Sequence, residues 1–197
     1  NDSIAMGNRA IASEANAISI GTGCQALGNR DVIIGSNTKG PANGISSSAA
    51  VGVGSNIQFV GASVGRIEAV AVGEGVQVSD YGTGLGAQAV AGRNSTAVGT
   101  YALAKGPGSI AIGSANNTTG TKQTFADGAD SIAIGNNSNT SSAATGSMAL
   151  GVNASTTIAN SVALGLGSIA NVAAVPVAGF AGSAPVGVVS VGSVGKE

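Results

Sequence analysis

The residues best suited to chemistry are two acids in the segment FADGAD, where Asp127 and Asp130 stand close together. Two neighbouring carboxylates can hold a cation or act as a general acid and base. The chain has only 9 acidic residues and no histidine, which removes histidine-based proton transfer and histidine metal sites. We interpret the pair as an isolated surface loop, with a cation site or a catalytic pair as the alternative.

Two further signals for chemistry have ordinary structural explanations. Cys24 is the only cysteine, so it forms neither an internal disulfide nor a multi-cysteine metal site. Its counterparts in neighbouring segments are Ala, Ser or Val, and we predict a small core residue. The segment GLGSIA (165–170) matches the dinucleotide-binding spacing G-x-G-x-x-A, but no amphipathic helix follows it. We therefore expect no enzyme and no cofactor or metal.

The composition favours strands built from small and β-branched residues. Glycine contributes 33 of 197 residues, charged residues 9% and aromatic residues 3%, whereas charged residues usually make up about 25% of a globular domain. The apolar content is mainly Ala, Val and Ile, which suits strands better than helices. The net charge of −1 and the lack of a basic cluster argue against nucleic acid and a polybasic membrane contact.

One five-residue sequence motif, which we call the repeated word, recurs along the chain and marks the position of each expected strand. SIAIG stands at 109–113 and 131–135, with variants SIAMG (3–7), SMALG (147–151) and SVALG (161–165). The base period is 14 residues, and the longer intervals are insertions. The closing glycines are Gly7, Gly21, Gly35, Gly54, Gly73, Gly86, Gly99, Gly113, Gly135, Gly151, Gly165 and Gly192. A weaker alternation follows each glycine, so each unit predicts strand, turn, short strand and turn. The fold class is therefore all-β, a parallel β-roll or solenoid of 14-residue repeats.

Strict alternation within the word gives each strand two faces. We predict that the large side chains form the core. These are Ile110, Ile112, Ile132, Ile134, Val162 and Leu164. A face that is almost always Ala or Ser suggests close approach of another surface, so we predict that several copies pack through it. The residues of this small face are Ala5, Ala71, Ala111, Ala133, Ala149 and Ala163.

The words SIAIG, SVALG and SMALG at this period, with the tail VVSVGSVGKE (188–197), resemble the head repeats of trimeric autotransporter adhesins, the YadA-like head family. The resemblance implies a left-handed β-roll that assembles as a homotrimer. It also implies a location on the outer-membrane surface of a Gram-negative bacterium, with an anchor outside this chain. The expected organisation is a head over 1–170 with insertions, then irregular last coils over 171–197 leading to a neck. We expect the chain to be part of a longer protein.

The resemblance further implies attachment to host cells or extracellular matrix without chemistry. We expect ligand contact either from the insertions (36–48, 55–68 and 114–130) or from the flat strand faces, where weak sites add through avidity. The candidate contact residues in and around the insertions are Lys39, Gln58, Phe59, Arg66, Lys122, Phe125 and Asp127. The alternative function is a rigid spacer that projects another adhesive domain, or self-association between cells.

Overall fold

The computed structural model describes residues 2–40, 50–59, 68–115, 123–171 and 186–192, and the regular elements in these ranges are β-strands. The chain divides into two compact units, Asn1–Tyr101 and Ala102–Glu197. Within the described ranges, no helix is long and apolar enough to cross a membrane. The predicted all-β class with parallel pairing is confirmed.

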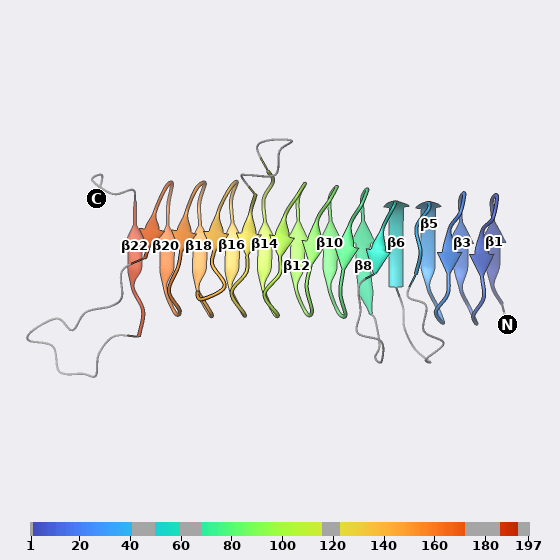
Figure 1. The fold of residues 1–197 in the computed structure, drawn as a ribbon, viewed down its shortest axis with the longest axis horizontal. Coiled ribbons are helices and arrows are strands. Elements are labelled where there is room, and N and C mark those ends of the chain that lie inside the picture. Colours follow the sequence, from blue (N-terminus) through green and yellow to red (C-terminus); the bar gives the residue numbers. More distant parts are fainter. Residues whose placement is uncertain (1, 41–49, 60–67, 116–122, 172–185, 193–197) are drawn as a thin grey trace, which may run out of the picture. The chain divides into compact units, whose positions relative to one another are not determined.

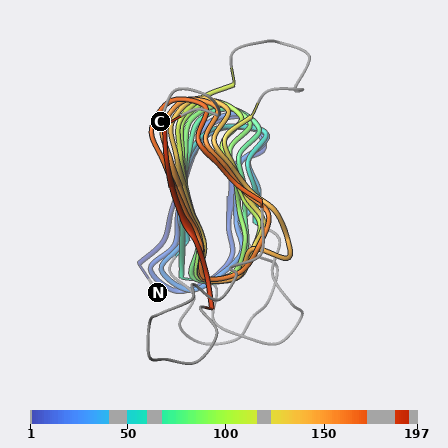
Figure 2. The same ribbon diagram turned by 90° about the vertical axis from the view of Figure 1, so that its left-hand side faces the viewer.

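In the first unit, the coils contribute strands to two sides, and the strands of each side stack in parallel (Figures 1 and 2). The coil of β5 adds an isolated bridge at Lys39 to the second side in place of a strand. The first side contains, in order, β1 (Ile4–Met6), β3 (Ile18–Ile20), β5 (Val32–Ser36), β6 (Ala50–Ser55), β8 (Ala69–Val72), β10 (Thr83–Leu85) and β12 (Thr96–Val98). The second side has two-residue strands: β2 (Ile11–Ala12), β4 (Gln25–Ala26), β7 (Gln58–Phe59), β9 (Gln77–Val78) and β11 (Val90–Ala91).

The second unit repeats this pattern. Its first side contains β14 (Ile110–Ile112), β16 (Ile132–Ile134), β18 (Met148–Leu150), β20 (Val162–Leu164) and β22 (Val189–Val191). Its second side contains β13 (Leu103–Ala104), β15 (Phe125–Ala126), β17 (Asn139–Thr140), β19 (Ser155–Thr156) and β21 (Ile169–Ala170). The repeated words pair in register, so that Ala111, Ala133 and Ala149 stack directly on one another.

Most closing glycines are required by both conformation and space. Gly135 has a φ of 125°, and a β-carbon built on it would lie 2.6 Å from the carbonyl oxygen of Gly151 in the next coil. Such a φ strains other residues, and the stacked backbone leaves no room for a side chain. Neighbouring coils also share side-chain hydrogen bonds here: Thr124 Oγ1 donates to the Gly135 carbonyl at 2.7 Å.

Cys24 makes the same kind of contact as Thr124. Its Sγ donates to the Gly35 carbonyl at 3.0 Å, and the side chain is fully buried. The thiol lies in a cluster with Ala17, Ala26 and Ile33. The prediction of a small core residue is confirmed.

The predicted assignment of the two strand faces is wrong. Most alanines of the small face point into the coil and have 0% of their surface exposed, namely Ala71, Ala111, Ala133, Ala149 and Ala163. Ala5 in β1 is the exception, since it is exposed. The predicted core residues lie on the outer face instead. Ile112 is 38% and Leu164 41% exposed, and the others are half-buried, namely Ile110, Ile132, Ile134 and Val162.

The reason for the reversal is the thinness of the coil. The inward positions of the two sides lie so close together that a β-carbon on Gly84 would lie 2.6 Å from Val76 Cγ1. Protein interiors are close-packed, so a space this narrow accepts Ala and Ser but not a second large side chain. The large side chains of the first side therefore point outward, except for Ile33 in β5, which is fully buried.

The predicted boundary near residue 170 falls where most of the following chain lies outside the described residues. In the described part, β22 pairs in parallel with β20, with Val162 opposite Val189. A further neck segment stays a prediction.

Candidate ligand-binding surface

The second side of the first unit carries a row of outward polar side chains, which we name the glutamine–lysine row: Gln25, Lys39, Gln58 and Gln77. Strand pairing and isolated bridges place each residue opposite the next. The residues beside them, Ala26 and Val78, are buried, so alternation directs the polar side chains away from the coil. The row therefore presents three glutamine amides and the Lys39 ammonium group in one line, and parallel strands space them about 4.8 Å apart.

The local sequence explains why these side chains share one line. Each residue of the glutamine–lysine row stands four positions after a closing glycine, and the turn that begins at this glycine has the same course in each coil. Amides donate and accept hydrogen bonds but do not titrate, and Lys39 only donates. The row therefore suits hydrogen bonding to an extended ligand rather than proton transfer.

The structure brings two of the predicted contact residues together and separates a third from them. Lys39 and Gln58 are both exposed and pair with one another across a bridge. Phe59 instead packs against the buried cluster that includes Ala17 and Ile33, so its ring serves the core. Arg66 lies outside the described residues. Sequence reasoning missed Gln25 and Gln77, although their position after the closing glycine identifies them.

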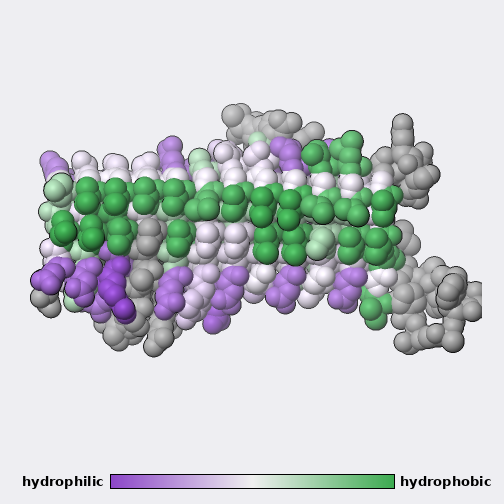
Figure 3. Space-filling view, turned by 180° about the vertical axis from the view of Figure 1, so that it is seen from behind, coloured by the Kyte–Doolittle hydropathy of each residue, from purple (hydrophilic) through white to green (hydrophobic). Residues whose placement is uncertain are grey.

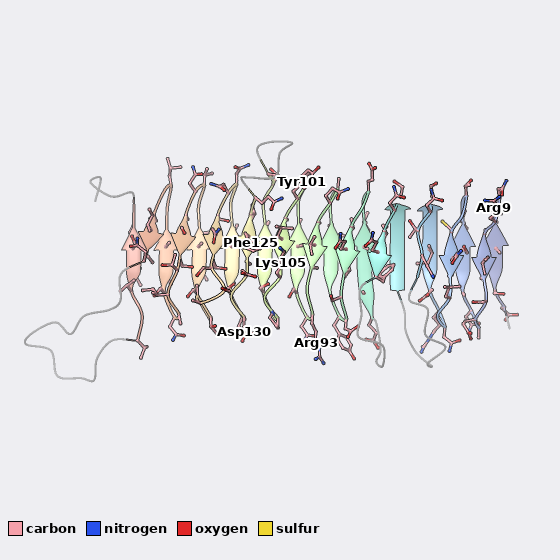
Figure 4. The ribbon with its side chains drawn as sticks, viewed as in Figure 1. Arg9, Arg93, Tyr101, Lys105, Phe125 and Asp130 are labelled. Carbon is pink, nitrogen blue, oxygen red and sulfur yellow. The ribbon has the colours of Figure 1, made fainter. Side chains whose placement is uncertain are left out.

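In the second unit, an aromatic group occupies the outward face of the second side. Phe125 pairs with Leu103 on one side and Asn139 on the other. Lys105 Nζ lies 5.1 Å from the centroid of the Phe125 ring, a cation–π contact. Figure 4 shows the two residues close together at mid-height of the coils. We name Phe125, Lys105 and Asn139 the aromatic patch.

Asp127 and Asp130 lie in the turn between β15 and β16, and Figure 4 shows Asp130 at the edge of the coils, away from Phe125. Asp127 is half-buried and its backbone N–H donates to the Thr140 carbonyl at 3.0 Å. Asp130 is exposed, with a φ of 53°, and its backbone N–H donates to the Pro107 carbonyl at 2.9 Å. Within the described part of the chain, no three potential metal ligands of the Asp, Glu, Cys or His type gather. Lys122 lies outside that part.

A second surface, on the first side of the coil, is apolar. Two outward positions of each strand form what we name the apolar rows, seen as two green lines in Figure 3. In the second unit, one row contains Ile110, Ile132, Met148, Val162 and Val189, and the other contains Ile112, Ile134, Leu150, Leu164 and Val191. Continuous apolar surface of this kind typically marks a contact with another macromolecule.

Comparison with known families gives one match to these coils. The family model described as YadA head domain repeat (2 copies) matches residues 1–23, 91–116, 126–144 and 142–168, just under half of the chain. The matched segments contain the strand–turn–strand coils described above. The predicted resemblance to YadA-like head repeats is confirmed.

Among solved structures, the collagen-binding domain of the Yersinia adhesin YadA is similar to this chain. The two are 20% identical, the alignment covers 93% of this chain and 92% of that chain, and the TM-score is 0.43. No curated protein matches the chain. The fold assignment rests on the strand pairing and on the repeats.

Proposed function

The chain carries YadA-like head repeats, and from this premise we propose that it is the surface-exposed head of a trimeric adhesin. The head attaches its bearer to host cells or extracellular matrix by multivalent contact without catalysis. It stands outside the outer membrane of a Gram-negative bacterium. The observation that supports the proposal is the coincidence of the head repeats with parallel coils that offer two flat surfaces.

Assembly is assigned to the apolar rows. They are half-buried or exposed in a single chain, and their Ile, Val, Leu and Met side chains gain from removal from water. A thin coil with an alanine interior buries little large apolar surface of its own, so contact between copies supplies the missing burial. This proposal replaces the predicted packing through alanine, and three copies remain the expected number.

Ligand contact is assigned to the second side, which the assembly leaves free because the apolar rows lie on the first. The glutamine–lysine row offers hydrogen bonds, and the aromatic patch offers a stacking surface beside a cation. Each contact is weak alone. Copies of the same surface on one particle raise the effective affinity through avidity.

The test is a binding panel with the assembled chain against collagen, fibronectin, laminin, epithelial cells and the chain itself. A variant that replaces Lys39, Gln58 and Gln77 with Ala removes three of the four side chains of the glutamine–lysine row. The matched control replaces Ser155 and Thr157, polar residues at β19 of the second unit that belong to neither the row nor the aromatic patch, with Ala. We expect saturable binding that falls by about tenfold or more in the row variant, equivalent to about 1.4 kcal/mol, and less in the control. Equal binding by both variants and the wild type would contradict the assignment of the site.

The alternative function is a rigid spacer or a self-associating head. The in-register pairing of the first side within each unit favours stiffness, which suits either role. Binding of the chain to itself alone supports self-association, and binding to nothing in the panel supports the spacer.

A further inference from the structure

The apolar rows of the first unit contain one polar interruption. In the row that includes Ile18, Val32 and Val70, the next two positions are Thr83 and Thr96. Figure 3 shows the interruption as a pale stretch within one of the two green rows. Among the other described positions of both rows, in either unit, the side chains are Ile, Val, Leu or Met.

The two threonines form an adjacent pair on the outward face. Thr83 of β10 pairs with Thr96 of β12, and the inward residue between Thr96 and Val98 is the fully buried Ala97. Both threonines are half-buried in the single chain. Within the described residues, neither hydroxyl is hydrogen-bonded to the protein, so both are satisfied by water until another surface covers them.

We propose that Thr83 and Thr96 set the axial register in which copies of this chain assemble through the apolar rows. The inference rests on the assembly part of the proposed function. The occupant of the face is a second copy, because contact along many coils requires a partner with the same axial spacing, and an identical chain has it.

Matching spacing alone does not fix the alignment. If one copy is displaced along the axis by one coil, about 4.8 Å, its apolar side chains still pack between apolar side chains of the other copy. Apolar contact alone therefore does not distinguish these alignments.

The threonine pair makes the alignments differ in energy. In the aligned assembly, the hydroxyls of one copy face those of the next and hydrogen-bond to them. After a slip of one coil, one threonine hydroxyl of each copy faces an apolar residue such as Val70 and loses its partner, which is unfavourable once water is excluded. A single polar position sets register in coiled coils by the same principle.

The experiment measures distances between copies of the full chain. A spin label is placed at Glu74→Cys, an exposed turn position between β8 and β9, in a Cys24→Ser background that leaves no other thiol. T83V/T96V replaces both hydroxyls with isosteric methyl groups. T100V changes an exposed turn threonine away from the rows and is the matched control. Pulsed electron resonance then reports the label-to-label distances in each assembly.

We expect one narrow distance for the background chain and for T100V. T83V/T96V should add longer distances that correspond to axial slips in steps of about 4.8 Å. Adding I18T/V32T to this variant places a polar pair elsewhere in the same row and should restore one distance. The single variants T83V and T96V provide the same test if the double variant does not fold.

The outcomes separate this inference from the proposed function. An assembled T83V/T96V variant with a single unchanged distance overturns the register role and leaves the assembly intact. A background chain with the light-scattering mass of one copy overturns the assembly and the register role together.

Discussion

The ring of Phe59 in β7 lies against the backbone of Gly52 in β6: a β-carbon on Gly52 would be 3.3 Å from both Cε2 and Cζ of the ring. The two residues belong to opposite sides of the coil, and both occupy inward positions, next in register to the buried Ile33 and Val78. Glycine on one side therefore provides the room for a phenyl ring on the other. Val76 and Gly84 show the same compensation.

This relationship predicts non-additive effects on stability. Gly52→Val overpacks the coil and should lower the free energy of unfolding by about 1–3 kcal/mol. Phe59→Ala opens a cavity and should cost about 3 kcal/mol. The double variant should cost clearly less than the sum, as measured by chemical denaturation. Gln58→Val, an outward change beside Phe59, is the control and should be nearly neutral. Additive costs would mean that the two residues do not share one space.

The alanine interior predicts that charge cannot enter the coil. Ala133 is fully buried and lies between Ala111 and Ala149. Ala133→Glu should therefore abolish folding, because an isolated buried carboxylate is strongly unfavourable. Ala133→Ser should fold, since Ser19 occupies the corresponding buried position in β3. Circular dichroism distinguishes the variants. A folded but unassembled Ala133→Glu chain would restore the view that alanine packs between copies.

The outward isoleucines should contribute little to the stability of one chain. Ile132 and Ile134 are half-buried in β16, so Ile→Ala at either site should cost about 1 kcal/mol. A core isoleucine would cost about 2–5 kcal/mol. Denaturation is measured at a concentration where light scattering reports single chains. A cost in the core range at both sites would contradict the outward placement.

Two buried threonines of the second unit should respond differently to the loss of their hydroxyls. Thr124 Oγ1 donates to the Gly135 carbonyl, whereas Thr156 Oγ1 is buried and has no hydrogen-bond partner among the described residues. Thr124→Val should cost about 1 kcal/mol, because it removes a hydrogen bond between coils, although the Gly135 carbonyl keeps the bond from the Ser138 hydroxyl. Thr156→Val should be neutral or stabilising. Equal costs in denaturation would show that the inter-coil hydrogen bond contributes nothing.

Sequence reasoning predicts the strands and the coil well, because both depend on local alternation and on period. The word SIAIG at 131–135 alternates strictly, and its neighbours pair at the predicted offset. Alternation does not say which face is inside. That depends on the distance between the two sides, which is decided by residues such as Ala126 and Ala104 on the second strands. Their small size identifies the narrow interior once both strands of a coil are considered together.

The candidate site, like the fold, is predictable only in part. The sequence identifies Lys39 and Gln58 as candidates because they lie in insertions between repeats. The feature that places them in one row is different: each stands four residues after a closing glycine. Phe59, one residue later, is directed inward by the same alternation. The number of residues between the closing glycine and a given position predicts whether the side chain there points into or out of the coil. The chemical type of the side chain alone does not predict this.

The most direct test of the central claim is the light-scattering mass of I132D/I134D beside that of the wild type. The account predicts an assembly of three times 18.5 kDa for the wild type and folded single chains for the variant, because two charges in each copy cannot enter an apolar contact. A variant that folds and keeps the wild-type mass would show that the apolar rows are not the surface through which the heads assemble.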